Sequence, residues 1–151
     1  MRTSTKGRYG VRAMLDLARN SSSAPVPLRD IAERQGISEH YLEQLFASLR
    51  KAGLVRSVRG TKGGYELASD PSGITVGQIL RVLEGPIGPT DCVADDDSAV
   101  HCEREDTCAT RYLWLKVQAA ISSVVDTTTL ADLVRVADQL EGKCTPPMYY
   151  I

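Results

Sequence analysis

The chain has 151 residues, of which 42% are hydrophobic, and its formal net charge at pH 7 is −1. This is enough apolar material for one compact domain, or for a small domain with an extension. No apolar run approaches the roughly 20 residues of a transmembrane helix, and no long apolar segment near the N-terminus marks a secretory signal. We therefore expect a cytoplasmic protein, in which the four cysteines are reduced, redox-active or metal-bound rather than joined in structural disulfides.

The small net charge conceals a basic part and an acidic part. Residues 1–65 contain 12 Lys and Arg against 5 Asp and Glu, a balance of +7, whereas the remaining residues carry −8. Such a division is expected when one surface of a protein approaches the phosphates of a nucleic acid.

The first predicted helix covers residues 5–20 and has an unusually basic first turn. Positive charge there opposes the helix dipole. A nearby phosphate would relieve the conflict, so Lys6 and Arg8 are candidate contacts to a nucleic-acid backbone, with a solvated basic N-terminus as the alternative. Residues 20–27 are predicted to form a polar loop.

Two further helices follow in close succession. Residues 28–35 place Leu28, Ile31 and Ala32 on one face, and Gly36 can end this helix in a left-handed conformation. Ser38 is a natural N-cap for a second helix that runs to Ala52. Its apolar positions recur at helical spacing: Leu42, Leu45, Phe46 and Leu49. Two helices joined by a short turn that contains Gly form the helix-turn-helix pattern.

A basic hairpin comes next. Residues 54–58 and 65–67 are predicted to be short strands on either side of Arg59-Gly60-Thr61-Lys62-Gly63-Gly64. This loop is rich in glycine and carries two cations, as a wing that enters a DNA groove would. Each element alone has a simpler interpretation, a packing motif or a hairpin with a solvated turn. The order helix, helix, basic hairpin favours a winged helix-turn-helix domain that binds DNA.

The second helix of such a motif lies in the major groove with its N-terminal residues at base edges. Glu43 can accept from cytosine amines, Gln44 can pair with adenine, and Arg59 and Lys62 would reach the minor groove or its phosphates. The candidate DNA-binding residues are Ser38, His40, Tyr41, Glu43, Gln44, Arg50, Arg56, Arg59, Thr61 and Lys62.

After a predicted helix that Thr75 caps and that runs to Glu84, residues 86–109 form a polar, acidic loop. It contains Cys92, Cys102 and Cys108, spaced C-x9-C-x5-C. Soft thiolates in such a loop suit an iron–sulfur cluster or zinc, while free or redox-active thiols are the alternative. The fourth ligand stays open: it could be His101, a nearby acid or a residue of a partner chain.

Residues 110–125 are predicted to form a helix with apolar residues on more than one stripe, and a shorter helix ends near Gly142. Because such a helix must be buried by more than its own small domain, we expect it to pair with its copy in a homodimer. A two-fold dimer would bind a near-palindromic DNA site. Cys144 is expected to be a free thiol, with a role as the fourth ligand as the alternative. The tail ends in Tyr149, Tyr150 and Ile151, which could pack on the body of the protein or bind a partner.

Three stretches, residues 2–10 (RTSTKGRYG), 38–45 (SEHYLEQL) and 59–65 (RGTKGGY), resemble the Rrf2 family of bacterial transcription regulators, and the resemblance covers nearly the whole chain. Its iron–sulfur branch implies a [2Fe–2S] cluster held by three cysteines in this same loop, although Arg111 stands where that branch has a histidine. The branch that represses cysteine metabolism implies cysteine synthase (O-acetylserine sulfhydrylase) as a partner, which captures a C-terminal isoleucine carboxylate.

We therefore predict a mainly α fold with a small β-hairpin. Its parts are a winged helix-turn-helix domain (1–85), a cysteine-containing cluster loop (86–109), dimerisation helices (110–142) and a C-terminal tail (143–151). The predicted function is a homodimeric repressor of iron–sulfur or cysteine metabolism genes that senses through a [2Fe–2S] cluster and is not an enzyme. The alternatives are a clusterless repressor that signals through bound cysteine synthase, a zinc-bound regulator, and a thiol oxidoreductase, which would lack a C-x-x-C pair.

Overall fold

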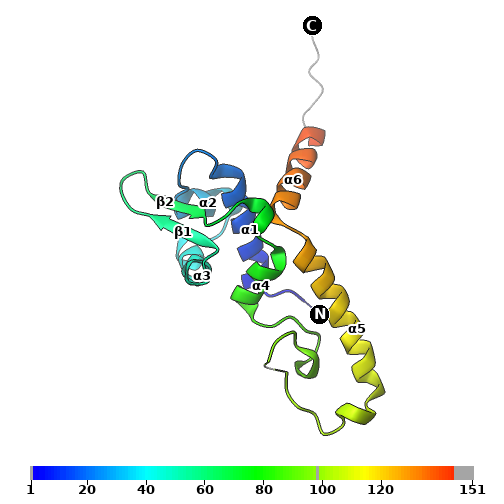
Figure 1. Cartoon of the computed structure of the whole chain (residues 1–151). Coiled ribbons are helices and arrows are strands. Elements are labelled where there is room, and N and C mark those ends of the chain that lie inside the picture. Colours follow the sequence, from blue (N-terminus) through cyan, green and yellow to red (C-terminus); the bar gives the residue numbers. More distant parts are fainter. Residues whose placement is uncertain (1, 98, 145–151) are drawn as a thin grey trace.

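The computed structural model describes residues 2–97 and 99–144. A helical head that carries a two-stranded hairpin is followed by a long loop that leads away from the head. A long helix then returns to the head, and a last helix starts beside the head and leads away from it (Figure 1). The elements are α1 (Thr5–Asn20), α2 (Leu28–Gln35), α3 (Glu39–Lys51), β1 (Val55–Val58), β2 (Gly64–Leu67), η1 (Pro71–Gly73), α4 (Val76–Glu84), η2 (Asp91–Val93), η3 (Glu105–Thr107), α5 (Ala109–Thr127) and α6 (Leu130–Cys144). The prediction of a mainly α fold with one hairpin is confirmed.

The core of the head is formed by the apolar faces of α1, α2, α3 and α4. The fully buried side chains come from all four helices, from β1, from the connection before α4 and from the start of α6: Met14, Leu17, Ile31, Leu42, Phe46, Leu49, Val55, Ile74, Ile79 and Leu130. The ring of Phe46 also meets Tyr65 of β2 edge-on, with centroids 5.0 Å apart. The hairpin thus packs directly on the core through this contact between β2 and α3.

Local sequence signals set the ends of the helices as expected. Gly36 ends α2 with φ +64°, a conformation that costs glycine little. Ser38 caps α3 by accepting from the Tyr41 amide at 3.1 Å. Thr75 and Gln78 form a reciprocal capping box at the start of α4. The helix predicted at residues 110–125 extends over Ala109–Thr127.

Two pairings between distant segments were not predicted. Val26, in the expected polar loop, exchanges two backbone hydrogen bonds of 2.8 Å with Tyr65 and so adds a bridge to the hairpin. Thr75 and Thr129 form a second bridge, which places the start of α6 beside the start of α4. Both connect residues more than 35 positions apart, beyond the reach of local patterns.

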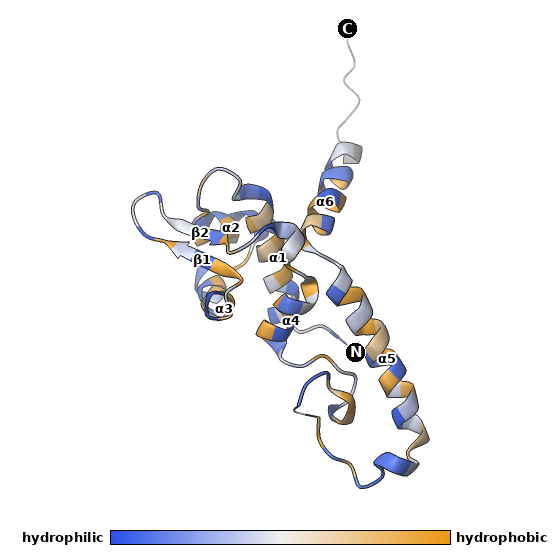
Figure 2. Cartoon of the chain, in the orientation of Figure 1, coloured by the Kyte–Doolittle hydropathy of each residue, from blue (hydrophilic) through white to orange (hydrophobic). Residues whose placement is uncertain are grey.

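Helix α5 buries none of its side chains fully within the single chain. Large apolar residues stay exposed along α5 and α6, where Figure 2 shows apolar segments along the outer helices: Tyr112, Leu113, Leu115, Val124, Val136 and Leu140. This exposure agrees with the expectation that α5 needs a covering partner. Within the described residues, no helix combines the length and apolar character needed to cross a membrane.

Candidate functional site

Helix α3 buries Leu42, Leu45, Phe46 and Leu49 and turns its other face to solvent. The side chains of His40 and Glu43 are 82% and 59% exposed, and Gln44 lies beside His40. Nine of the ten predicted DNA-binding residues are exposed, which leaves them accessible to a large ligand. The exception is Tyr41, which is half-buried and packs edge-on against Tyr9 of α1, with centroids 6.1 Å apart.

The wing is an antiparallel hairpin in which Arg56 faces Glu66 across the strands, with their charged atoms 3.6 Å apart. Arg50, at the end of α3, donates to the Ser57 hydroxyl at 3.5 Å and so connects the helix to β1. The wing tip holds Arg59, Thr61 and Lys62, all exposed. Among the residues that the structure describes, neither tip cation has an ion-pair partner, so their charge is available to an anion.

The N-terminus of α1 has an acidic partner that the sequence did not reveal. Glu84, the last residue of α4, accepts through Oε1 from the Ser4 amide at 2.8 Å, from the Ser4 hydroxyl at 2.6 Å and from the Gly7 amide at 3.1 Å. A carboxylate in this position offsets the positive end of the helix dipole. The protein therefore supplies an anion of its own there, and contact of Lys6 and Arg8 with a nucleic-acid backbone stays a prediction. Lys6 and Arg8 are both exposed.

The cysteine loop leaves its three thiols unpaired. Cys102 is exposed, whereas Cys92 and Cys108 are partly buried, with each sulfur 3.2 Å from a threonine hydroxyl, that of Thr90 or Thr110 respectively. The pKa of Cys108 is lowered, first by the Thr110 hydroxyl and then by the backbone N–H of Arg111. Over the described ranges, no three His, Cys, Asp or Glu side chains converge as a metal site.

The other candidate ligand, His101, is 84% exposed, and its Nδ1 lies 3.3 Å from Glu105. The same carboxylate pairs with Arg111 at 2.7 Å. Arg111, near the start of α5, therefore forms an ion pair with the cysteine loop. The thiol of Cys144 and the predicted partner-binding residues Tyr149, Tyr150 and Ile151 lie outside what the structure describes.

A cluster of charges attaches the cysteine loop to the head. Arg81 of α4 donates to Asp95 at 2.8 and 2.6 Å and to Asp126 of α5 at 2.5 and 3.0 Å. Asp95, three residues after Cys92, is only 9% exposed and also accepts from the Ile87 amide at 2.7 Å. The Arg81 guanidinium lowers the pKa of Asp126. One side chain thus joins α4, the loop and α5.

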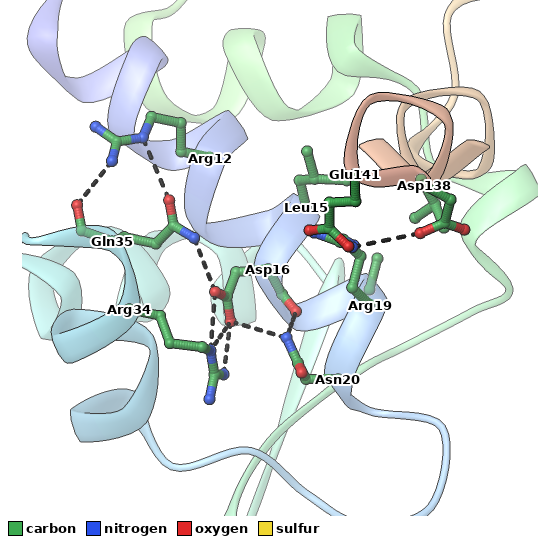
Figure 3. A pocket seen from close by; sticks show the side chains of 11 residues that line it. Arg12, Leu15, Asp16, Arg19, Asn20, Arg34, Gln35, Asp138 and Glu141 are labelled. Carbon is green, nitrogen blue, oxygen red and sulfur yellow. Dashed lines mark hydrogen bonds and ion pairs between the residues drawn. The ribbon is translucent and has the colours of Figure 1, made fainter. Parts of the chain in front are cut away.

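A cavity of about 590 Å³ lies between α1, α2 and α6 (Figure 3). Its floor is the buried carboxylate of Asp16, which accepts from Arg34 at 2.7 to 3.2 Å and from Gln35 at 2.8 Å. On the side of α6, Arg19 pairs with Asp138 at 3.3 Å and Glu141 at 2.6 Å. These contacts connect α1 to both neighbouring helices, so the cavity walls are part of the scaffold that positions α3.

A helix-turn-helix with an exposed polar face on its second helix, followed by a hairpin with cations at its tip, defines a winged helix-turn-helix protein. The Rrf2 family model, described as an iron-dependent transcriptional regulator, matches residues 3–136. The chain therefore belongs to the Rrf2 family, as its motifs indicated, and is a transcription regulator rather than an enzyme.

The similar proteins include two named regulators, CymR and IscR. The regulator CymR of Bacillus subtilis is 45% identical over 151 residues, which is the whole of both chains. The regulator IscR of Yersinia enterocolitica is 49% identical over 141 residues, covering 93% of this chain and 84% of IscR. Among solved structures, IscR of T. potens gives a TM-score of 0.79 at 47% identity, over 99% of this chain and 97% of that one. CymR of B. subtilis, titled the global cysteine regulator, gives 0.77 at 46% identity, over 90% and 98%.

Proposed function

We propose that the chain is a homodimeric repressor that binds a near-palindromic DNA site through α3 and the wing. In this proposal Cys92, Cys102 and Cys108 bind a [2Fe–2S] cluster that controls DNA binding. The observation that carries the DNA-binding part is the exposed polar face of α3 beside two wing cations that have no ion-pair partner in the described part of the chain. Division of the chain into residues 1–85, 86–109, 110–142 and 143–151 belongs to the same proposal.

The two parts of the interface contribute differently. Glu43 and Gln44 offer an acceptor and an amide to base edges, which gives sequence preference. Arg59 and Lys62 bring positive charge to phosphates, which gives affinity without preference. Pairing of the apolar surface of α5 with a second copy would present two α3 helices to successive turns of the major groove.

The donor set of the loop fits an iron–sulfur cluster in type. Its three thiols are free, and the lowered pKa of Cys108 favours the thiolate form that ligates metals. Such a cluster supplies one-electron redox chemistry when bound. The thiols are not assembled in the described conformation, and Asp95 is held by Arg81 and Ile87. Ligation therefore requires a change in the loop that brings the three thiols together, with the fourth ligand from His101, an acid or the partner chain.

The cluster is tested on protein purified without oxygen, by its visible spectrum and by iron and sulfide analysis. We expect the absorption bands of a [2Fe–2S] centre and their loss in Cys102→Ala. The matched control is Cys144→Ala, a cysteine outside the loop, which should retain them. Colourless protein after attempted reconstitution would reject the cluster, and zinc at one equivalent per chain would favour the zinc-bound regulator.

A clusterless regulator that signals through cysteine synthase is the second candidate. The observation in its favour is that similarity to CymR extends over the whole of both chains, whereas the alignment with IscR covers 93% of this chain. Deletion of residues 149–151 should then abolish co-purification with cysteine synthase while leaving DNA binding intact. Equal recovery of the enzyme with full-length and shortened protein would reject this candidate.

A further inference from the structure

On the exposed face of α3, the side chain of His40 lies beside two other polar side chains. The Nδ1 atom of His40 lies 3.6 Å from Oε2 of Glu43, and its Nε2 atom lies 3.3 Å from Nε2 of Gln44. These residues are three and four positions apart, which places them on the same side of a helix. His40 therefore stands between the two residues assigned to base recognition.

The chemistry of the three groups fixes the direction of these contacts. The amide nitrogen of Gln44 can only donate, so a neutral imidazole in this contact carries its proton on Nδ1, the atom on the side of Glu43. The Nε2 atom is then a lone-pair acceptor, and the amide nitrogen of Gln44 donates to it. Gln44 is left with a free carbonyl oxygen and one free N–H.

We propose that His40 is a positioning residue that fixes the side-chain amide of Gln44 in the orientation that reads adenine. This inference rests on the proposed role of α3 in the major groove. Adenine presents an acceptor at N7 and a donor at N6, which match the free N–H and the free oxygen of Gln44. Glu43 takes part indirectly, because the negative charge of its carboxylate, 3.6 Å from Nδ1, favours a proton on that atom.

The same reasoning predicts what a donor at position 40 would do. If the side chain there donated to Gln44, the amide oxygen would turn toward it and both N–H groups would face the groove. Two donors match the O6 and N7 acceptors of guanine. The identity of residue 40 would thus decide whether Gln44 favours adenine or guanine.

The test is a selection of duplexes from a randomised library, comparing the full-length protein with its His40→Ala, His40→Lys and Gln44→Ala variants. We expect the unmodified protein to prefer adenine at one position of each half-site, and Gln44→Ala to lose that preference. His40→Ala should reduce it roughly five-fold, the usual net effect of one neutral hydrogen bond, and His40→Lys should shift it toward guanine. Because His40 is exposed, all variants should melt near the temperature of the unmodified protein.

Two results would overturn the inference, and they differ in what else they reject. If Gln44→Ala changes the preference but both His40 variants keep the original adenine position, His40 has no positioning role while α3 remains the reading helix. If Gln44→Ala also leaves every position unchanged, the role of Gln44 in base reading, which belongs to the proposed function, fails as well.

Discussion

Arg81→Ala is the change that most directly tests how the cysteine loop is attached to the head. The substitution removes two hydrogen bonds to Asp95 and two to Asp126. Asp95 is 9% exposed and would keep its hydrogen bond from the Ile87 amide. The variant therefore leaves a largely buried carboxylate without its counter-charge.

The expected loss in the free energy of unfolding follows from how deeply Arg81 and Asp95 are buried. Breaking a buried ion pair by removing one partner costs about 3–5 kcal/mol. Arg81 is itself 33% exposed, so water compensates in part, and we expect about 2–3 kcal/mol. For a chain of this size, each kcal/mol lowers the melting temperature by roughly 2–4 °C, so a fall of roughly 5–10 °C is expected.

The assay is urea and thermal unfolding at pH 7 of Arg81→Ala, Asp95→Ala and the double variant. We expect a coupling free energy of about 2 kcal/mol from this cycle. The matched control is Arg135→Ala, which removes an exposed pair with Asp132 one turn away and should cost under about 1 kcal/mol. A coupling below about 0.5 kcal/mol, or equal effects of Arg81→Ala and Arg135→Ala, would refute the assigned role.

Three further outcomes are expected. Arg59→Ala should weaken binding to every DNA sequence and reduce the salt dependence of the binding constant by about one phosphate contact. The measurement is DNA titration at several salt concentrations. Unchanged affinity would contradict the assignment of the hairpin as a DNA-binding wing. Arg34→Ala should lower the free energy of unfolding by about 2–3 kcal/mol, because it leaves the buried Asp16 carboxylate, 3% exposed, without its counter-charge. Arg29→Ala on the same helix should change the free energy of unfolding by under about 0.5 kcal/mol. Equal effects of the two substitutions would contradict a stabilising role of the Arg34–Asp16 pair. The pKa of Asp126 is lowered in the folded state by Arg81, so this pair stabilises the fold above about pH 4 and is lost as the pH falls through the lowered folded pKa. Urea unfolding of Asp126→Asn should show a weaker decline in acid, and an identical decline would contradict this.

Much of the DNA-binding architecture could be predicted because its signals are local. Gly36, Ser38 and Thr75 set helix ends through their own backbone or side-chain chemistry, and the apolar spacing of α3 determines which face is buried. The glycine-rich basic loop between two short strands likewise predicts a hairpin with an exposed tip. Each of these features depends on residues within a few positions of one another.

The tertiary structure alone decided the contacts that join these elements. These contacts pair Glu84 with the start of α1, Asp16 with Arg34, and Arg81 with both the loop and α5. The paired residues lie 14 to 80 positions apart in the sequence. No local spacing encodes such pairs, because they arise only when separate helices pack. The cysteines show the same limit: their spacing predicted the kind of ligand, but only the path of the loop determines that the thiols lie apart in this conformation. The sequence by itself thus determined the elements and their exposed chemistry, whereas packing determined which charges meet.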